Sequence, residues 1–264
     1  MPSYSIFTKP WRTASTDELI EIVRGLGFDA IEFPLRDGYQ VEPGSAESSL
    51  PAFTRKLKDN GIRIEDVAST PTEPVLAACA ASGIPMVRVM FIPRIQRDYL
   101  DQEAQYLKEL DSLERLCLKH GVKVGLQTHC GAGATTTADT ARIIGRYDPR
   151  AIGAVWDAAH SGLAGEQPEQ SIDLAWSHLC LVNFKNARYQ MAGRAPTGEA
   201  EFRPYFCPGQ DGQCSWPRAV KRLKDKGYGG AWCVPAEYSD PRSDDELLDY
   251  VKRDFAWLRS LVEG

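Results

Sequence analysis

Short apolar runs alternate with longer amphipathic stretches along the whole chain. The apolar runs cover residues 4–7, 29–33, 62–68, 85–91, 122–127, 152–156, 179–184 and 230–234. Continuous apolar runs of this length are typical of strands buried on both faces of a parallel sheet. The pattern therefore predicts eight buried strands, spread evenly through the sequence.

The stretches between these runs have the spacing of helices. They cover residues 15–26, a segment around Leu50, Phe53 and Leu57, and residues 74–81, 99–120, 136–147, 169–176, 216–226 and 244–262. The clearest is 99–120, where leucines recur every three residues on one face. Gly27, Gly61 and Gly121 follow three of these segments, at the position where glycine commonly ends a helix.

Eight strands, each followed by a helix, predict a single-domain (β/α)₈ TIM barrel over residues 1–264. Two Rossmann halves are the competing architecture. That architecture calls for a GxGxxG motif after a strand, and we find none in the sequence. In a (β/α)₈ barrel the functional residues lie at the carboxyl ends of the strands, so we expect catalytic or binding residues at those positions.

Composition narrows the class of protein. Charged residues make up 25% of the chain and its formal net charge is −5, with no basic stripe, which argues against a nucleic-acid partner. The first twelve residues lack the apolar core of a signal peptide, and no apolar run approaches the length of a membrane span. Seven scattered cysteines without a CxxC motif favour reduced thiols and a cytoplasmic protein.

Polar and reactive residues follow four neighbouring strands of the predicted barrel. They are Gln127 and His129 after the fifth strand, Asp157 and His160 after the sixth, Asn183, Lys185 and Asn186 after the seventh, and Glu237 after the eighth. Each residue alone has an ordinary interpretation as a turn, a cap or a satisfied buried group. Their coincidence at one end of a closed barrel predicts a shared ligand site.

Five segments carry a resemblance to a known family: LGFDAIEF, GVKVGLQTH, GAVWDAAHSG, LVNFKNARY and GYGGAWCVPAEY. They resemble the sugar phosphate isomerase/epimerase family, which has a xylose-isomerase-like barrel. The resemblance implies a divalent metal ion, commonly Mn²⁺, Mg²⁺ or Co²⁺, held by Glu, Asp, His and Glu at the strand ends. The matching positions are Gln127, Asp157, Asn183 and Glu237, while His160 and Lys185 match a second histidine and a lysine of the family.

Two positions depart from the family pattern. Gln127 replaces a carboxylate and Asn183 replaces an imidazole, so both offer only a neutral carbonyl oxygen to a hard cation. The affinity for a divalent metal should therefore fall. Gln127 also cannot accept a proton, so epimerisation by two carboxylate bases is not expected.

One-base chemistry remains open to this set of residues. The metal would polarise a sugar carbonyl and stabilise the enediolate formed when a proton leaves. Glu237 would be a ligand or the base, with His160 or His129 as the acid. Lys185 would anchor a hydroxyl or phosphate, or stabilise an oxyanion as a point charge.

Four further residues are predicted to contact the substrate: His129, Trp11, Arg36 and Asn186. Trp11 would stack on a sugar ring and Arg36 would pair with phosphate or carboxylate, although surface packing and a loop salt bridge explain them equally well. The long segment 187–215, rich in Gly, Pro and aromatic residues, is compatible with a lid or with a contact between copies of the chain in a homo-oligomer.

These observations favour a metal-assisted isomerase or epimerase acting on a small sugar or sugar derivative. A lyase or dehydratase suits the lost second carboxylate almost as well. A non-catalytic or heteromeric sugar-binding barrel, with a degraded metal site, is a third interpretation. The DNA-repair endonuclease branch of the superfamily is disfavoured, because the chain has only four histidines and a negative net charge.

Overall fold

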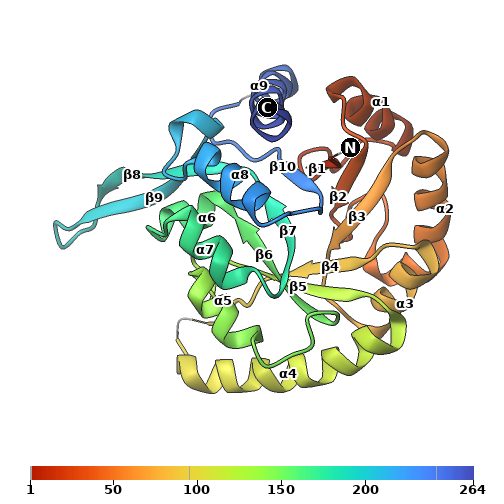
Figure 1. The fold of residues 1–264 in the computed structure, drawn as a ribbon, viewed down its shortest axis with the longest axis horizontal. Helices are drawn as coiled ribbons and strands as arrows, with labels where there is room; N and C mark the ends of the chain where they lie inside the picture. Colours follow the sequence, from red (N-terminus) through yellow and green to blue (C-terminus); the bar gives the residue numbers. More distant parts are fainter. Residues whose placement is uncertain (1, 95, 242) are drawn as a thin grey trace.

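The computed structural model describes residues 2–94, 96–241 and 243–264. Eight parallel strands in this part of the chain close into a barrel, in the order β1-β10-β7-β6-β5-β4-β3-β2 (Figure 1). They are β1 Tyr4–Phe7, β2 Ala30–Phe33, β3 Arg63–Ala68, β4 Met86–Val89, β5 Lys123–Gln127, β6 Ile152–Asp157, β7 Leu179–Asn183 and β10 Trp232–Pro235. The predicted (β/α)₈ barrel is confirmed, with every predicted barrel strand present.

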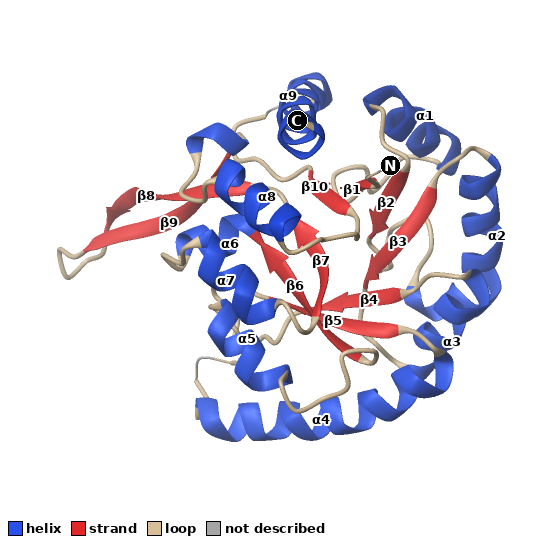
Figure 2. Cartoon of the chain, viewed as in Figure 1, coloured by secondary structure: helices blue, strands red, loops and turns tan. Residues whose placement is uncertain are grey.

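Helices cover the outside of the barrel, as Figure 2 shows in blue around the red strands. They are α1 Thr16–Leu26, α2 Ala46–Asp59, α3 Glu73–Ser82, α4 Tyr99–His120, α5 Thr137–Ile144, α6 Ala158–Leu163, α7 Pro168–Ala175, α8 Trp216–Asp225 and α9 Asp244–Glu263, with short 3-10 turns η1 Pro43–Ser45 and η2 Gly209–Asp211. Local sequence explains their ends. Ser15 begins α1 with a capping box to Glu18, and Gly27 ends it in a left-handed conformation. No helix in the described ranges is long and apolar enough to cross a membrane.

The barrel closes where the first strand meets the last. Tyr4 pairs with Trp232 and Phe7 with Pro235 in a parallel ladder, so the carboxyl ends of β1 and β10 lie side by side. On the opposite wall, Gly125 of β5 allows a close approach: a Cβ atom there would lie 2.8 Å from Cγ2 of Val155. These contacts bring the ends of the strands into one ring.

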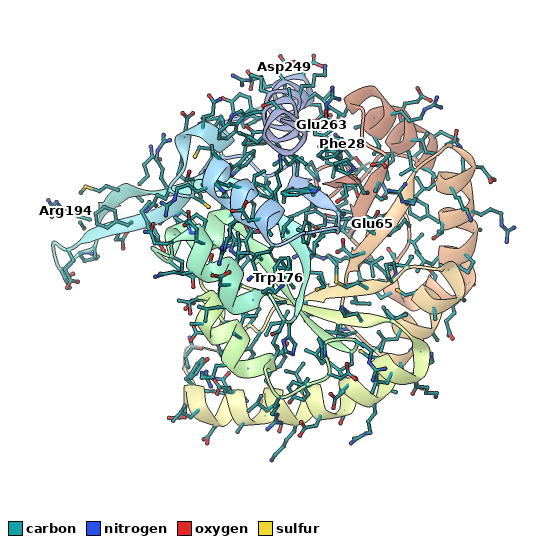
Figure 3. The ribbon with its side chains drawn as sticks, in the orientation of Figure 1. Phe28, Glu65, Trp176, Arg194, Asp249 and Glu263 are labelled. Atoms are coloured by element: carbon teal, nitrogen blue, oxygen red, sulfur yellow. The ribbon has the colours of Figure 1, made fainter. Side chains whose placement is uncertain are left out.

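The segment 187–215, expected as a loop, contains a β-hairpin. Strands β8 (Asn186–Arg194) and β9 (Ala200–Cys207) pair antiparallel, and Figure 1 shows the hairpin projecting from the side of the barrel. Arg194, near its tip, lies far from the barrel in Figure 3. The sequence prediction missed the hairpin because its strands are largely exposed, so they do not form the apolar runs that mark the barrel strands. A role for it as a lid or as a contact between copies remains a prediction.

Candidate active site

Five of the eight predicted strand-end residues line a small cavity at the carboxyl end of the barrel. Its volume is about 60 Å³, and it is lined by Phe7, Lys9, Arg36, Arg88, Met90, Gln127, His129, Asn183, Lys185, Pro235 and Glu237. The structure thus brings together six of the residues singled out from the sequence: Arg36, Gln127, His129, Asn183, Lys185 and Glu237. Asp157 is fully buried and contacts two of these residues.

Asp157 ends β6 and begins α6. The backbone N–H groups of Ala159 and His160 donate hydrogen bonds to Oδ1 of Asp157, at 3.0 and 3.2 Å. Its other oxygen, Oδ2, accepts a hydrogen bond of 2.8 Å from Nε2 of Gln127 and lies 3.5 Å from Nζ of Lys185. Burial raises the pKa of Asp157, and Lys185 opposes that shift. Both carboxylate oxygens are therefore fixed by donors of the protein.

Lys185 is a buried ammonium group between two carboxylates. Its Nζ lies 2.7 Å from Oε2 of Glu237 as well as 3.5 Å from Oδ2 of Asp157. Burial alone would lower the pKa of Lys185, but the two carboxylates outweigh it and hold the pKa above its usual value. Burial likewise would raise the pKa of Glu237, but Lys185 and Lys9 outweigh it and hold the pKa well below its usual value. The lysine is therefore protonated and the glutamate ionised.

Arg88 is a central residue that the sequence prediction missed. It comes from β4 and is buried; its Nε donates to Glu32 and its Nη1 donates to the side-chain carbonyl of Gln127. Its guanidinium also lies over the ring of Phe7, 4.9 Å from the ring centroid. The signal in the sequence was an arginine inside the apolar run MVRV. Lys9, which contacts Glu237, was also missed, although it follows directly after the first strand.

Two histidines contact each other beside the cavity, with ring centroids 3.9 Å apart and ring planes tilted by 39°. Nδ1 of His129 lies 2.7 Å from the carbonyl oxygen of Cys130, so this hydrogen bond assigns the proton to Nδ1 and leaves Nε2 as a free base. The backbone N–H of Cys130 donates to Nδ1 of His160, which places that ring's proton on Nε2. Burial, and then Lys185, lowers the pKa of both histidines, so both are neutral. His129 lines the cavity, whereas His160 is fully buried behind it.

A family model described as "Xylose isomerase-like TIM barrel" matches residues 20–261. The chain belongs to this family. Nearly the whole barrel, including every strand end that faces the cavity except that of β1, falls within the match.

Similar proteins include both dehydratases and epimerases. An inosose dehydratase of Lacticaseibacillus casei is 25% identical over 127 residues, which are 46% of this chain and 42% of that protein. The chain therefore spans less than half the length of this curated relative. D-psicose 3-epimerase from Clostridium cellulolyticum H10 has a TM-score of 0.75 at 13% identity, covering 98% of this chain and 99% of that one. The E. coli 3-keto-D-glucoside 4-epimerase has a TM-score of 0.74 at 16% identity, covering 98% and 100%.

Two residues predicted to contact the substrate lie elsewhere in this xylose isomerase-like barrel. Trp11 is 5% exposed and packs in the hydrophobic core, because the chain turns back after Thr8. Asn186 is fully buried, and its Nδ2 donates to the carbonyl oxygens of Gly209 and Cys214, at 2.7 and 2.8 Å. These hydrogen bonds connect the start of the hairpin to the segment that follows it. Neither residue lines the cavity, so the expectation that Trp11 and Asn186 contact the substrate is corrected.

The four residues predicted to hold a divalent metal converge, but their donor atoms are already engaged. The carbonyl of Gln127 accepts from Arg88, Asp157 is held by Gln127 and Lys185, and Glu237 is held by Lys185 and Lys9. Among the four, Oδ1 of Asn183 is the buried oxygen without a partner in the described chain. This arrangement does not fit Mn²⁺, Mg²⁺ or Co²⁺, because a dication there would lie against an ammonium group.

A different group of metal-type ligands lies next to the cavity. The ligand atoms of His129, Cys130 and His160 all lie within 4.8 Å of one another. Imidazole and thiolate suit softer ions than the oxygen-rich set predicted from the sequence. This group is therefore no substitute for the predicted Mn²⁺, Mg²⁺ or Co²⁺ site.

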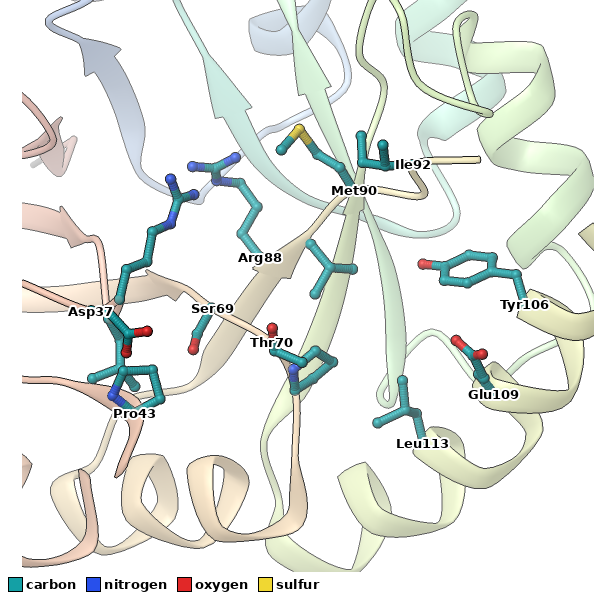
Figure 4. A pocket seen from close by; sticks show the side chains of 14 residues that line it. Asp37, Pro43, Ser69, Thr70, Arg88, Met90, Ile92, Tyr106, Glu109 and Leu113 are labelled. Carbon is teal, nitrogen blue, oxygen red and sulfur yellow. The ribbon is translucent and has the colours of Figure 1, made fainter. Parts of the chain in front are cut away.

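A larger groove adjoins the small cavity and shares Arg36, Arg88 and Met90 with it. Its volume is about 490 Å³, and it runs between the ends of β2, β3 and β4 and the helix α4 (Figure 4). The side-chain oxygens of Ser69 and Tyr106, which line it, are buried without a hydrogen-bond partner among the described residues. Nε of Arg36 donates to the carbonyl oxygen of Ala68 at 3.3 Å, and within the described chain Arg36 forms no ion pair. The groove thus offers unpaired donors next to the cavity.

Proposed function

We propose that the protein is an isomerase that moves a proton between neighbouring carbons of a hydroxy-carbonyl sugar derivative. One observation carries this proposal: a neutral histidine with a free Nε2 faces the same small cavity as two fixed cations. His129 supplies the base, and Lys185 and Arg88 supply the positive charge. Proton removal next to a carbonyl needs these two elements.

The reaction follows from this arrangement. Nε2 of His129 takes the proton from the carbon next to the carbonyl. The electron pair of the C–H bond forms a carbon–carbon double bond, and the π pair of the carbonyl moves onto its oxygen to give an enediolate. Lys185 and Arg88 stabilise that oxyanion without reorganising, because carboxylates and Gln127 already hold them in place. His129 then returns the proton to the neighbouring carbon, while the hydroxyl proton passes to the former carbonyl oxygen.

The geometry supports one base rather than two. Gln127 has no basic group, and Glu237 is paired with both Lys185 and Lys9. Asp157 accepts two backbone hydrogen bonds and contacts Lys185. An epimerase with carboxylate bases on opposite faces of the sugar is therefore not supported.

The position of Arg36 indicates an anionic substrate. The cavity of about 60 Å³ has room for the reacting carbons, and the groove of about 490 Å³ has room for the rest of the molecule. Around the small cavity the cations are Lys9, Arg36, Arg88 and Lys185 and the carboxylates are Glu32, Asp157 and Glu237, while the groove adds the carboxylates Asp37 and Glu109. Arg36, rather than a net positive charge of the whole site, therefore indicates the anion. Among the described residues Arg36 forms no ion pair, so it would bind a carboxylate or phosphate, while Ser69 and Tyr106 would bind hydroxyl groups. The proposed substrate class is a sugar acid or a sugar phosphate.

A dehydratase is the second candidate, favoured by the similarity to inosose dehydratases. Its first step is the same removal of a proton by His129. The electron pair then expels a hydroxyl group from the next carbon, and the protonated His129 donates its proton to that group so that water leaves. One base on one face of the substrate suffices for this sequence.

The test is product analysis with a panel of neutral, carboxylated and phosphorylated ketoses in D₂O. An isomerase gives a product with the same skeleton that carries solvent deuterium on carbon, seen by NMR, whereas a dehydratase gives a product that has lost one water, seen by mass spectrometry. The substitution His129→Gln should lower the rate about 10²- to 10⁴-fold. His120→Gln, at the end of α4 next to Glu73, is the matched control and should leave the rate unchanged. An unchanged rate in His129→Gln would remove that residue from the mechanism.

A further inference from the structure

We infer that the ammonium group of Lys185 and the guanidinium group of Arg88 take the place of the divalent cation, so that the protein neither binds nor needs Mn²⁺ or Mg²⁺. The inference rests on the proposed function only for the catalytic use of these cations. Its claim about metal binding stands on the contacts at the centre of the site.

Lys185 fills the position between the two carboxylates that would hold a metal. Its Nζ lies 2.7 Å from Oε2 of Glu237 and 3.5 Å from Oδ2 of Asp157, and the lysine side chain is 4% exposed. An ion bound by both carboxylates would have to displace this ammonium from a buried position. Lys9 contacts the remaining oxygen of Glu237, so that carboxylate is engaged at both atoms.

Hydrogen bonds at both ends of the Gln127 side-chain amide hold it in an orientation that does not suit metal binding. Its Oε1 accepts from Nη1 of Arg88, and its Nε2 donates to Oδ2 of Asp157 at 2.8 Å. Reversing the amide to redirect its oxygen would place the NH₂ group against the donors of Arg88. It would also place the carbonyl oxygen against the carboxylate of Asp157. Arg88 itself is held by buried Glu32, so it cannot move away without leaving that carboxylate unpaired.

The charges are already balanced without a metal. Asp157 and Glu237 contribute two negative charges, and Lys185 and Lys9 contribute two positive charges in contact with them. A dication added to this group would leave an excess of positive charge in a site of low solvent exposure. Asn183 keeps its Oδ1 buried and unpaired at the cavity wall, where it can accept a hydrogen bond from a substrate hydroxyl.

The test measures Mn²⁺ directly, without any substrate. Purified protein should contain no stoichiometric Mn²⁺ or Mg²⁺, and titration followed by electron paramagnetic resonance should show no site for Mn²⁺ in the wild-type protein. The midpoint of thermal unfolding should be the same with added Mn²⁺ and with chelator. Stoichiometric Mn²⁺ in the wild-type protein, or a rise in its unfolding midpoint with added Mn²⁺, would overturn the inference without any variant being measured.

The substitution Lys185→Met gives the complementary result. It leaves Asp157 and Glu237 side by side without the ammonium between them, so Mn²⁺ affinity should rise at least about tenfold over wild type. Lys226→Met is the matched control: Lys226 pairs with Asp173 on the surface, 2.9 Å away, and its loss should not change Mn²⁺ binding. If Lys185→Met does not fold, the wild-type titration still decides.

The outcome separates this inference from the proposed function. Mn²⁺ binding between Asp157 and Glu237 in the wild-type protein refutes the inference whether or not a substrate is turned over. An absence of Mn²⁺ binding supports it, even if every compound in the panel is left unchanged and the proposed isomerase activity fails.

Discussion

Removing Arg88 should destabilise the protein mainly because it leaves the buried carboxylate of Glu32 without an ion-pair partner. Glu32 is fully buried and pairs with Arg88, which is 6% exposed. Breaking a buried ion pair by deleting one partner costs about 3–5 kcal/mol, whereas neutralising both partners costs far less. We therefore expect Arg88→Met to lower the free energy of unfolding by about 3–5 kcal/mol, and the double substitution Arg88→Met/Glu32→Gln to lower it by less than about 2 kcal/mol.

The same reasoning gives a pH dependence for Arg88→Met. Burial already raises the pKa of Glu32 in the wild type against the opposing Arg88, and removing Arg88 raises it further. The stability that depends on protonated Glu32 is present at low pH and is lost more steeply in the variant as the pH rises. The deficit should therefore grow between about pH 5 and pH 8, by up to about 1.4 kcal/mol per pH unit in which folded Glu32 stays protonated. The double variant has no carboxylate at this position and should not show this dependence.

The assay is urea unfolding at about pH 5 and about pH 8, followed by tryptophan fluorescence. Arg150→Met is the control, because Arg150 pairs with Asp148 at the surface and its loss should cost less than about 1 kcal/mol. The reasoning is refuted if Arg88→Met costs less than about 1 kcal/mol, or if the double variant costs as much as the two single variants together.

Three further predictions concern stability, each measured by denaturant or thermal unfolding. Burial raises the pKa of Asp254 to about 6 against the opposing hydrogen bond from Tyr238. Relative to Asp254→Asn, the wild type should therefore lose up to about 3 kcal/mol of unfolding free energy as the pH rises from about 4 to 6. A difference between the two proteins that stays constant with pH would contradict this. Gly125→Ala should cost about 1–3 kcal/mol by crowding Val155, and an unchanged midpoint would show that the strands can move apart. Burial raises the pKa of Asp66, whose carboxylate oxygens have no hydrogen-bond partner in the described chain. The substitution Asp66→Asn should therefore stabilise the protein more at high pH than at low pH. An equal change in stability at both pH values would contradict this prediction.

The barrel was predictable because its strands are buried on both faces. Such strands form uninterrupted apolar runs, and glycines mark the ends of several preceding helices. The end of each strand was also predictable to within a few residues, which placed Gln127, Asp157, Asn183 and Glu237 at one rim. The sequence therefore predicted that these four residues lie at the same rim of the barrel.

The pairing inside the site was not predictable, because it depends on contacts between strands far apart in the chain. Arg88 precedes Gln127 by 39 residues and follows Glu32 by 56, and no local pattern joins them. Trp11 lies four residues after the end of β1 yet turns into the core, since a large aromatic side chain gains more by burial than at a polar rim. Asn186 directly follows Lys185 but serves the hairpin, a structure that composition did not reveal.

Anomalous diffraction from a crystal soaked in Mn²⁺ tests the central claim most directly, namely that side-chain cations of the protein occupy the centre of the site. We predict no anomalous peak between Asp157 and Glu237, with Nζ of Lys185 still in contact with both carboxylates. A peak within bonding distance of both carboxylates, with Lys185 displaced, would contradict the claim.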